Sequence, residues 1–495
     1  MSFRRLAKHI LIYGSGVWAG KAIGFIMIPV YTHALTTADY GVLELASRTT
    51  DIAAMVLGLG LTAALIRFHA EARTAEQRDD VIRTAIVSAG IMGMAASVIL
   101  ALLAAPVSSV IFGSVRYGSI LRLALIGMGL ELATMTPLVL LRIHERSVLF
   151  AAINLGRLGV ALGLNIYLVV VRHMGVVGVF TSNLVGVSLV MIVLVIATRQ
   201  YWRPGIDLPT LKRMLAYSVP LVPSSLAMFV LNFGDRYFLR AHWGLSVLGV
   251  YALGYKLCLV MPALVMEPLG LAWSAIVFEV ANREDSGRVY ARYFNGYMFC
   301  VAFFSVALAA LSKDVIKAMA DPGYGDAWKV VPVVILAFTV WASVNVFEIG
   351  ALIEKKTWLR TLSGLAAAAA ALLAYAALIP RWGAMGAAWA TMIGFTAMAV
   401  SSCILSARVH PIPYDLRRAA LLLAIGALVY GGSTLVPGFG VIPALGRVLV
   451  VAVMPVALWA VRYFEPENVA AVLGKWRGER KERSADERMR VSSER

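Results

Sequence analysis

Cysteine and charge are both scarce in this chain of 495 residues. Its three cysteines, Cys258, Cys300 and Cys403, each lie within an apolar run, which argues against a disulfide framework and against a cysteine-based metal site. Charged residues make up 15% of the chain, whereas soluble domains contain about 25%. This composition excludes a water-soluble enzyme, a disordered chain and a nucleic-acid-binding protein.

Sequence signatures of catalysis are missing as well. No glycine-rich phosphate loop with a following Lys-Ser or Lys-Thr is found, which excludes ATP hydrolysis. There is no Asp-x-Asp triplet of the kind a nucleotide-sugar transferase needs, and the longest outer loop, 312–329, has no carboxylate–histidine constellation. The seven histidines do not cluster in the sequence, so zinc is not expected. We therefore expect neither an enzyme nor a metal site.

Apolar residues dominate instead. They make up 60% of the chain, and the mean hydropathy is +0.79. A helix that spans a membrane needs about 20 mostly apolar residues. By this criterion the sequence predicts an all-α integral membrane protein with fourteen spans: 10–35, 41–66, 81–104, 120–141, 149–171, 176–197, 215–238, 247–272, 289–311, 330–353, 359–379, 384–407, 419–435 and 441–461.

The distribution of Lys and Arg among the loops predicts the orientation. With the N-terminus inside, the inner segments carry 31 of these residues and the outer loops carry 8. Cytoplasmic loops are enriched in Lys and Arg, so both termini are expected in the cytoplasm. The first apolar run has no small-residue cleavage site after it and is expected to be a retained helix. The polar segment 465–495 is expected to be a cytoplasmic tail.

The sequence repeats at an offset of 208 residues. Gly41-Val42 followed by Arg48 matches Gly249-Val250 followed by Lys256. Three glycines at and after the start of span six likewise match three at span twelve: Gly175, Gly178 and Gly186 correspond to Gly383, Gly386 and Gly394. Each unit holds six spans, an even number, so both halves enter the membrane from the same side. Parallel repeats of this kind place a substrate site between the halves. We expect bundles over 1–200 and 201–410, followed by two extra helices over 411–464.

Five segments resemble one transporter family. They are PVYT at 29–32, ADYG at 38–41, DRYFL at 235–239, GVYALGYKL at 249–257 and GAMGAA at 383–388. Together they resemble the polysaccharide-flippase branch of the multidrug/oligosaccharidyl-lipid/polysaccharide exporter superfamily. The resemblance covers about residues 5–460, on the span count above. It implies transport of undecaprenyl-pyrophosphate-linked oligosaccharide from the inner to the outer leaflet of the bacterial inner membrane by alternating access.

Cations inside the spans are the strongest functional signal, because each costs about 2.5–3.5 kcal/mol to insert. Lys21, Arg48, Arg157 and Lys256 lie too deep to reach the interface easily. The resemblance extends to the related lipid II flippase branch, which carries cavity cations on the spans that hold Lys21, Arg48 and Lys256 here. We expect these four residues to bind a pyrophosphate head, with a structural role as the alternative for Arg157. The alternative for Arg48 is simple pairing on its own helix face, because acids lie four residues before it and three after it.

Carboxylates within the spans are candidates for coupling transport to H⁺ or Na⁺. They are Glu44, Asp51, Glu131, Glu267 and Glu348. For each of these carboxylates, the alternative to ion coupling is a structural role. Asp235 and Arg236 are expected to form a pair at the outer end of span seven, either as a gate or as a structural ion pair.

The expected function is therefore that of a flippase for surface polysaccharide biosynthesis, such as O-antigen, lipopolysaccharide or exopolysaccharide. An ion-coupled multidrug exporter of the same superfamily and a lipid II-type peptidoglycan precursor flippase are the alternatives. The expected partners are the lipid-linked oligosaccharide, membrane lipids, and a polysaccharide polymerase or chain-length regulator. No nucleic-acid partner and no cofactor beyond the coupling ion are expected.

Overall fold

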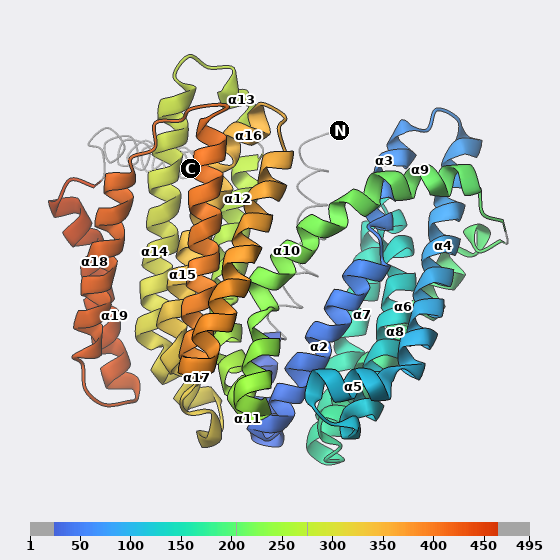
Figure 1. Cartoon of the computed structure of the whole chain (residues 1–495), viewed down its shortest axis with the longest axis horizontal. Coiled ribbons are helices and arrows are strands. Elements are labelled where there is room, and N and C mark those ends of the chain that lie inside the picture. Colours follow the sequence, from blue (N-terminus) through green and yellow to red (C-terminus); the bar gives the residue numbers. More distant parts are fainter. Residues whose placement is uncertain (1–23, 204, 275, 464–495) are drawn as a thin grey trace, which may run out of the picture. The chain divides into compact units, whose positions relative to one another are not determined.

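The computed structural model describes residues 24–203, 205–274 and 276–463. By spatial clustering the chain forms two compact units. The first comprises 1–283 and 312–412, and the second comprises 284–311 and 413–495. Every regular element of the described residues is helical, which confirms the predicted all-α class (Figure 1). Lys21 and the tail 465–495 lie outside the described residues.

The first unit contains both six-span halves apart from part of one helix. Its first half holds α2 (Thr37–Leu57), α3 (Leu61–Glu71), α4 (Ala75–Leu102), α5 (Ala104–Phe112), α6 (Gly118–Ile143), α7 (Ser147–Asn165) and α8 (Gly175–Ala197). The short helix α9 (Leu208–Ser218) leads into the second half. That half holds α10 (Val222–Phe233), α11 (Asp235–Cys258), α12 (Glu267–Ser274), α13 (Val277–Ala281), α15 (Val331–Phe347), α16 (Ile349–Ile353) and α17 (Trp358–Ala407).

The second unit is a smaller group of helices. It holds α18 (Leu416–Thr434), α19 (Val441–Ala460) and residues 286–311 of α14 (Ser286–Met319). The Tyr463 hydroxyl donates a hydrogen bond to the Asn295 carbonyl at 2.9 Å, and the rings of Phe294 and Tyr414 lie 5.2 Å apart. These contacts attach the ends of the last two helices to α14.

Eleven helical segments of the described residues are long and apolar enough to cross a membrane, rather than fourteen. Two of them, Leu208–Leu271 and Trp358–Ala407, each contain two predicted spans. Within these segments Gly244 has φ +83° and Gly383 has φ +54°, so each long helix is interrupted by a glycine in a conformation that other residues rarely adopt. Since most of the first predicted span lies outside the described residues, these two mergers account for the difference in number.

Helix starts follow the side chains that the sequence places there. Thr36 caps α2, and Asp39 returns the bond to the Thr36 backbone, which forms a capping box. Thr74 and Gln77 form the same arrangement at the start of α4. The predicted span 41–66 is broken where Leu59 and Gly60 both have positive φ, so that α2 and α3 are separate helices. Unpaired amides at these helix starts are therefore satisfied by local side chains.

The two repeats meet at a reciprocal glycine crossing between α2 and α11. A Cβ on Gly41 would lie 2.1 Å from the carbonyl oxygen of Leu245, and a Cβ on Gly249 would lie 1.9 Å from that of Thr37. Thr37 and Leu245 are themselves 208 positions apart. Helix backbones in a membrane approach this closely only where small residues remove the side chain. The crossing is therefore symmetric about the repeat, in agreement with the offset in the sequence.

Loops that were predicted on one side of the membrane lie together. The Tyr324 hydroxyl of loop 312–329 donates to the Leu35 and Thr36 carbonyls at 3.0 and 2.9 Å, and both loops were predicted outside. On the opposite side Glu354 pairs with His410 at 3.1 Å. This grouping supports the alternation of inner and outer loops in the first unit.

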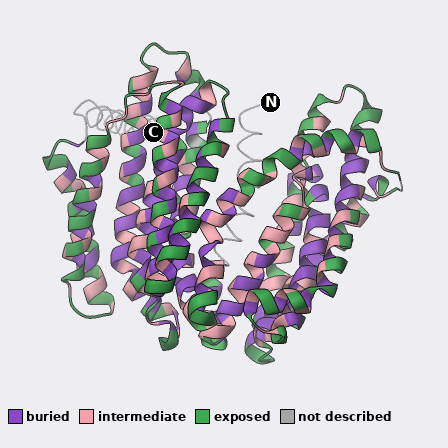
Figure 2. Cartoon of the chain, viewed as in Figure 1, coloured by how far each residue is buried: buried purple, intermediate pink, exposed green. Residues whose placement is uncertain are grey.

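Burial differs sharply among the helices of this unit. The segment Pro322–Ile353, which includes α15, has most of its apolar window buried, whereas Ser147–Val171 has most of its window exposed (Figure 2). In a membrane the exposed apolar side chains contact lipid, so exposure of large hydrophobic residues is expected there. The α15 segment is therefore central to its half, and α7 is peripheral.

Candidate functional site

A group of charged side chains lies on α2 and α11 beyond the glycine crossing. Arg48 follows Gly41 by seven residues and Lys256 follows Gly249 by seven, about two helical turns in each case. Because the crossing is symmetric, both cations project from the same region of the first unit. The repeat therefore brings together one cation from each half.

Arg48 forms ion pairs with two carboxylates of its own helix. Its Nε lies 3.3 Å from a Glu44 carboxylate oxygen, and its Nη1 lies 2.7 Å from a carboxylate oxygen of Asp51. The guanidinium also lies 4.3 Å from the centroid of the Phe233 ring. The face predicted from the spacing is present, and the side chain of Arg48 keeps 23% of its surface exposed. The guanidinium is therefore held by both carboxylates and remains partly accessible.

Asp235 and Arg236 form a buried pair that extends to α2. Arg236 Nη1 lies 2.6 Å from Asp235 Oδ1, and its Nε lies 3.3 Å from the same Glu44 oxygen that Arg48 contacts. Their side chains are 0% and 1% exposed, so this is not the interfacial pair that the sequence suggested. The reason is that the helix continues through Gly234 in α-helical conformation and reverses only at Gly244.

Aromatic rings enclose this buried pair. The Tyr251 hydroxyl donates a hydrogen bond to Asp235 Oδ2, and the Arg236 guanidinium lies 4.0 Å from the Tyr255 ring centroid and 5.0 Å from that of Phe233. Contacts of this kind stabilise a desolvated guanidinium. These three aromatics were not among the predicted site residues, although the i,i+4 spacing of Tyr251 and Tyr255 places both on one helix face.

Lys256 differs from the two arginines. Its ammonium lies 5.8 Å from the centroid of the Tyr31 ring, and it interacts electrostatically with Glu44 and Arg48. No carboxylate of the described residues lies within ion-pair distance of it. In an apolar setting an ammonium without a paired anion is costly, which makes this position receptive to an incoming negative charge.

Arg157 forms an ion pair with a carboxylate near the charged group. Its Nη2 lies 2.9 Å from Glu131 Oε1 and 3.3 Å from Asn183 Oδ1. Glu131 lies close enough to Asp51 for the two negative charges to repel each other. Arg157, which had no visible acidic neighbour in the sequence, thus has one in Glu131, and this pair lies near the Arg48–Asp51 pair.

The remaining candidates lie apart from this charged group. Glu348 is buried and accepts from Arg360 Nε at 2.6 Å and from the Ser402 hydroxyl at 3.4 Å, a contact between α15, α16 and α17. Glu267 is exposed at the start of α12. Lys21, the fourth predicted cation, lies outside the described residues. The structure therefore brings together Arg48, Lys256 and Arg157 with Glu44, Asp51, Glu131, Asp235 and Arg236.

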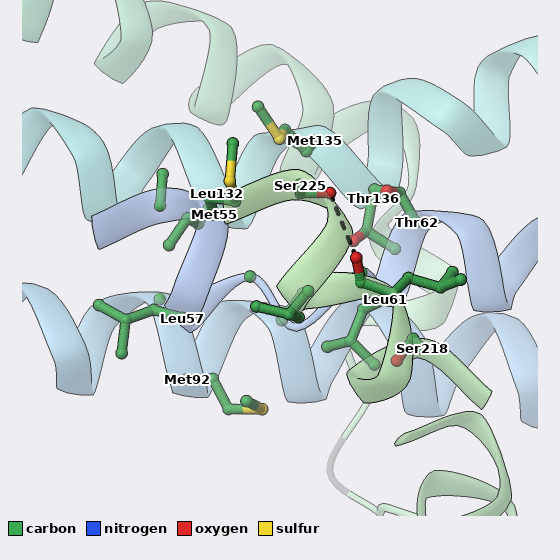
Figure 3. A pocket seen from close by; sticks show the side chains of 17 residues that line it. Met55, Leu57, Leu61, Thr62, Met92, Leu132, Met135, Thr136, Ser218 and Ser225 are labelled. Carbon is green, nitrogen blue, oxygen red and sulfur yellow. Dashed lines mark hydrogen bonds between the residues drawn. The ribbon is translucent and has the colours of Figure 1, made fainter. Parts of the chain in front are cut away.

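A separate cavity of about 210 Å³ lies beside the break between α2 and α3 (Figure 3). Its walls come from α2, α3, α4, α6 and the start of α10, and its polar groups are hydroxyls such as those of Thr62, Thr136, Ser218 and Ser225. Ser225 donates to the Leu221 carbonyl at 3.4 Å, drawn as the dashed line in Figure 3. None of its lining residues is charged, so this cavity suits an apolar group rather than a phosphate.

Comparison with known proteins decides the family. A family model described as "Polysaccharide biosynthesis protein" matches residues 6–274, more than half of the chain. The chain belongs to this polysaccharide biosynthesis protein family. All the residues of the charged group lie inside the matched range, as do four of the five segments that suggested the resemblance. No protein with a curated description matches the sequence.

Solved structures show that this family member has the fold of the superfamily named from the sequence. The lipid II flippase MurJ in an inward closed conformation is similar with a TM-score of 0.73 and 12% identity, covering 92% of this chain and 99% of its own. A multidrug resistance MATE family transporter of the MOP superfamily, in an inward-facing conformation, gives 0.58 and 14% over 78% and 94%. The Vibrio cholerae MATE transporter VcmN gives 0.55 and 12% over 82% and 96%. The predicted all-α fold of this superfamily is therefore confirmed, whereas the count of fourteen spans is not.

Proposed function

We propose that this member of the polysaccharide biosynthesis protein family is a flippase rather than an enzyme. It translocates undecaprenyl-pyrophosphate-linked oligosaccharide from the inner to the outer leaflet of the bacterial inner membrane by alternating access. The observation that carries the proposal is the pair of repeat-related cations, Arg48 and Lys256, beside the crossing of the two halves. Fixed cations replace the hydration that a pyrophosphate loses inside a membrane.

The acids of the group determine how an anionic substrate would enter. Glu44, Asp51 and Asp235 equal Arg48, Arg236 and Lys256 in number, but they pair with the two arginines and not with Lys256. A pyrophosphate would compete with Glu44 and Asp51 for Arg48 and would meet Lys256 directly. Binding of H⁺ or Na⁺ at either carboxylate would free Arg48 for the substrate, which links ion movement to transport.

A lipid II-type precursor is the second candidate. It is favoured by the similarity to MurJ along almost its entire length. The pyrophosphate and the prenyl chain are common to both substrates, so the charged group fits either one. A drug-exporter function receives less support, because Glu44 and Asp51 already hold Arg48, and Asp235 holds Arg236, which leaves these acids engaged rather than open to an organic cation.

Translocation in reconstituted vesicles tests the proposal. We expect the native chain to move an undecaprenyl-pyrophosphate oligosaccharide between leaflets, and both Arg48→Ala and Lys256→Ala to lower the rate by about tenfold or more, since each removes a charge-assisted contact worth about 1.5–3 kcal/mol. Arg122→Ala is the matched control, because this arginine lies in a predicted span but is exposed, and among the described residues its side chain bonds only the Ala101 carbonyl, at 3.2 Å.

The same vesicles separate the alternatives. Faster movement of lipid II than of the oligosaccharide lipid would assign the peptidoglycan precursor as substrate. Efflux of an organic cation without movement of either lipid would identify a drug exporter. Normal translocation by both variants, with both folded, would show that Arg48 and Lys256 are structural.

A further inference from the structure

A second cavity lies among loops that were predicted on the outer side of the membrane. Its volume is about 630 Å³, within the range of about 300–1,000 Å³ of small-molecule sites. All four segments that line it belong to the first unit: the start of α2, the Gly244 turn, the 322–330 loop and the Gly383 turn. Tyr251, which binds Asp235, also lines it, so the cavity adjoins the charged group, but the two cations assigned to the pyrophosphate, Arg48 and Lys256, do not line it.

Two tryptophans define the character of this cavity. Trp243 and Trp382 are 46% and 57% exposed, and both line it. The Trp243 indole donates from Nε1 to the Ile379 carbonyl at 2.8 Å, and a Cβ on Gly383 would lie 3.1 Å from its ring. One tryptophan is thus fixed in place against a glycine turn while its ring remains accessible.

Packing alone does not require a tryptophan at this position. The repeat mates of Gly383 and Trp243 are Gly175 and Leu35, and a Cβ on Gly175 would lie 3.9 Å from Leu35. In the first half Leu35 therefore packs beside the glycine turn, where the Trp243 indole packs in the second half. The repeat mate of Trp382 is Met174. An aromatic belt at the membrane interface would be expected on both halves, whereas the paired tryptophans occur in one.

Polar groups surround the two rings. Lys329 Nζ and Asp326 Oδ1 form an exposed pair at 2.9 Å, and Ser246 and Thr37 also line the cavity. A pyranose ring presents an apolar face of C–H groups and an edge of hydroxyls. Exposed indole faces bind the apolar face, and a carboxylate, an ammonium and hydroxyls bind the edge.

We propose that this cavity is a carbohydrate-binding site that receives sugar residues of the translocated molecule on the outer side. The inference rests on the proposed function for the origin of the sugar, but its site is separate from that of the pyrophosphate. Trp243 and Trp382 stack on the sugar, and Asp326, Lys329 and Ser246 bind its hydroxyls.

Binding to the full chain in lipid nanodiscs tests the site with three probes. They are the lipid-linked oligosaccharide fraction of cells that naturally produce the protein, undecaprenyl pyrophosphate without sugar, and the oligosaccharide released from the lipid by mild acid. The double variant Trp243→Leu/Trp382→Met carries the side chains of the first half. We expect it to bind the glycosylated lipid at least about tenfold more weakly, a difference of 1.4 kcal/mol, with unchanged affinity for undecaprenyl pyrophosphate.

Controls separate this site from the pyrophosphate site. Trp389→Met alters another exposed tryptophan of α17 that does not line the cavity and should change nothing. Arg48→Ala should weaken both lipids equally. Unchanged binding of the glycosylated lipid by the double variant, or equal weakening of both lipids, would overturn the sugar site. If neither lipid binds the native chain, the proposed function fails. The sugar site is then tested by the released oligosaccharide alone, which should bind the native chain and not the double variant.

Discussion

The side chain of Glu44 joins two ion pairs of the first unit. One of its carboxylate oxygens contacts Arg48 from the same helix and Arg236 from the other half. When two guanidinium groups share one carboxylate oxygen, each is stabilised less by it than it would be alone. Arg236 has Asp235 in addition, and Arg48 has Asp51, so the sharing leaves neither cation without an anion.

The Asp235–Arg236 pair should contribute strongly to stability because it is buried. Asp235→Asn leaves Arg236 with only part of its compensation, and loss of one partner of a buried pair costs about 3–5 kcal/mol. We expect a clear fall in the melting temperature in detergent, measured by size-exclusion chromatography after heating. The double variant Asp235→Asn/Arg236→Gln should recover part of it.

The control for this loss is a pair on the surface. Arg83 Nη2 lies 2.7 Å from Asp80 Oδ1, and the side chains of Asp80 and Arg83 are 41% and 35% exposed. Such pairs are worth about 0–1 kcal/mol, so Asp80→Asn should scarcely change the melting temperature. An Asp235→Asn variant as stable as the native chain would contradict a structural role for the buried pair.

Spacing along a helix predicted only the local part of this network. Glu44, Arg48 and Asp51 are four and three residues apart, so their shared face followed from helix geometry. Glu131 and Arg157 are 26 residues apart, and Glu44 and Arg236 are 192 apart. Contacts between separate helices depend on how those helices pack, which a single sequence does not specify.

Among the helices, the crossing of α2 and α11 depends on two glycines. In Gly249→Ala the new methyl would meet the Thr37 carbonyl, a backbone atom that cannot rotate away. Overpacking of this kind costs about 1–3 kcal/mol, so we expect lower melting temperature and lower yield of folded protein. Gly41→Ala should behave in the same way because the crossing is reciprocal.

A glycine with free space around it provides the comparison. Gly270 lies in α12 and has nothing within 4 Å of an added Cβ. Gly270→Ala should be neutral or should stabilise the helix by up to about 1 kcal/mol. If Gly249→Ala and Gly270→Ala melted alike, the close approach of the two backbones would not limit stability.

Helix existence was predictable from apolar length, whereas helix ends were not. The apolar run over 41–66 gave no sign that Leu59 and Gly60 both adopt positive φ and divide it. The reversals at Gly244 and Gly383 were expected as loops of several residues, but each is a sharp change of direction within a few residues. Glycine permits such a turn, and the sequence alone does not show which of the 42 glycines uses that freedom.

For the whole molecule, the orientation in the membrane remains a prediction from the Lys and Arg distribution. We expect Asp326→Cys, introduced into a chain without Cys258, Cys300 and Cys403, to react with a membrane-impermeant maleimide on intact spheroplasts. Glu354→Cys should react only after permeabilisation, because its loop is predicted inside.

Each outcome of this labelling has a definite meaning. Labelling of Glu354→Cys alone in intact spheroplasts would invert the orientation. Labelling of both positions before permeabilisation would contradict the alternation of inner and outer loops. The variants replace exposed side chains of the first unit, so neither should impair folding.

The reciprocal contact of Gly41 and Gly249 also bears on how such a chain could arise. The same surface of each half meets the same surface of the other, which is the isologous arrangement of a twofold homodimer. An ancestral six-helix subunit with one glycine at this position could form that dimer, and gene duplication with fusion would preserve it. Since six helices return the chain to its starting side, the fused copy needed no reversal of insertion. The two halves have since diverged, as the leucine at 35 and the tryptophan at 243 illustrate.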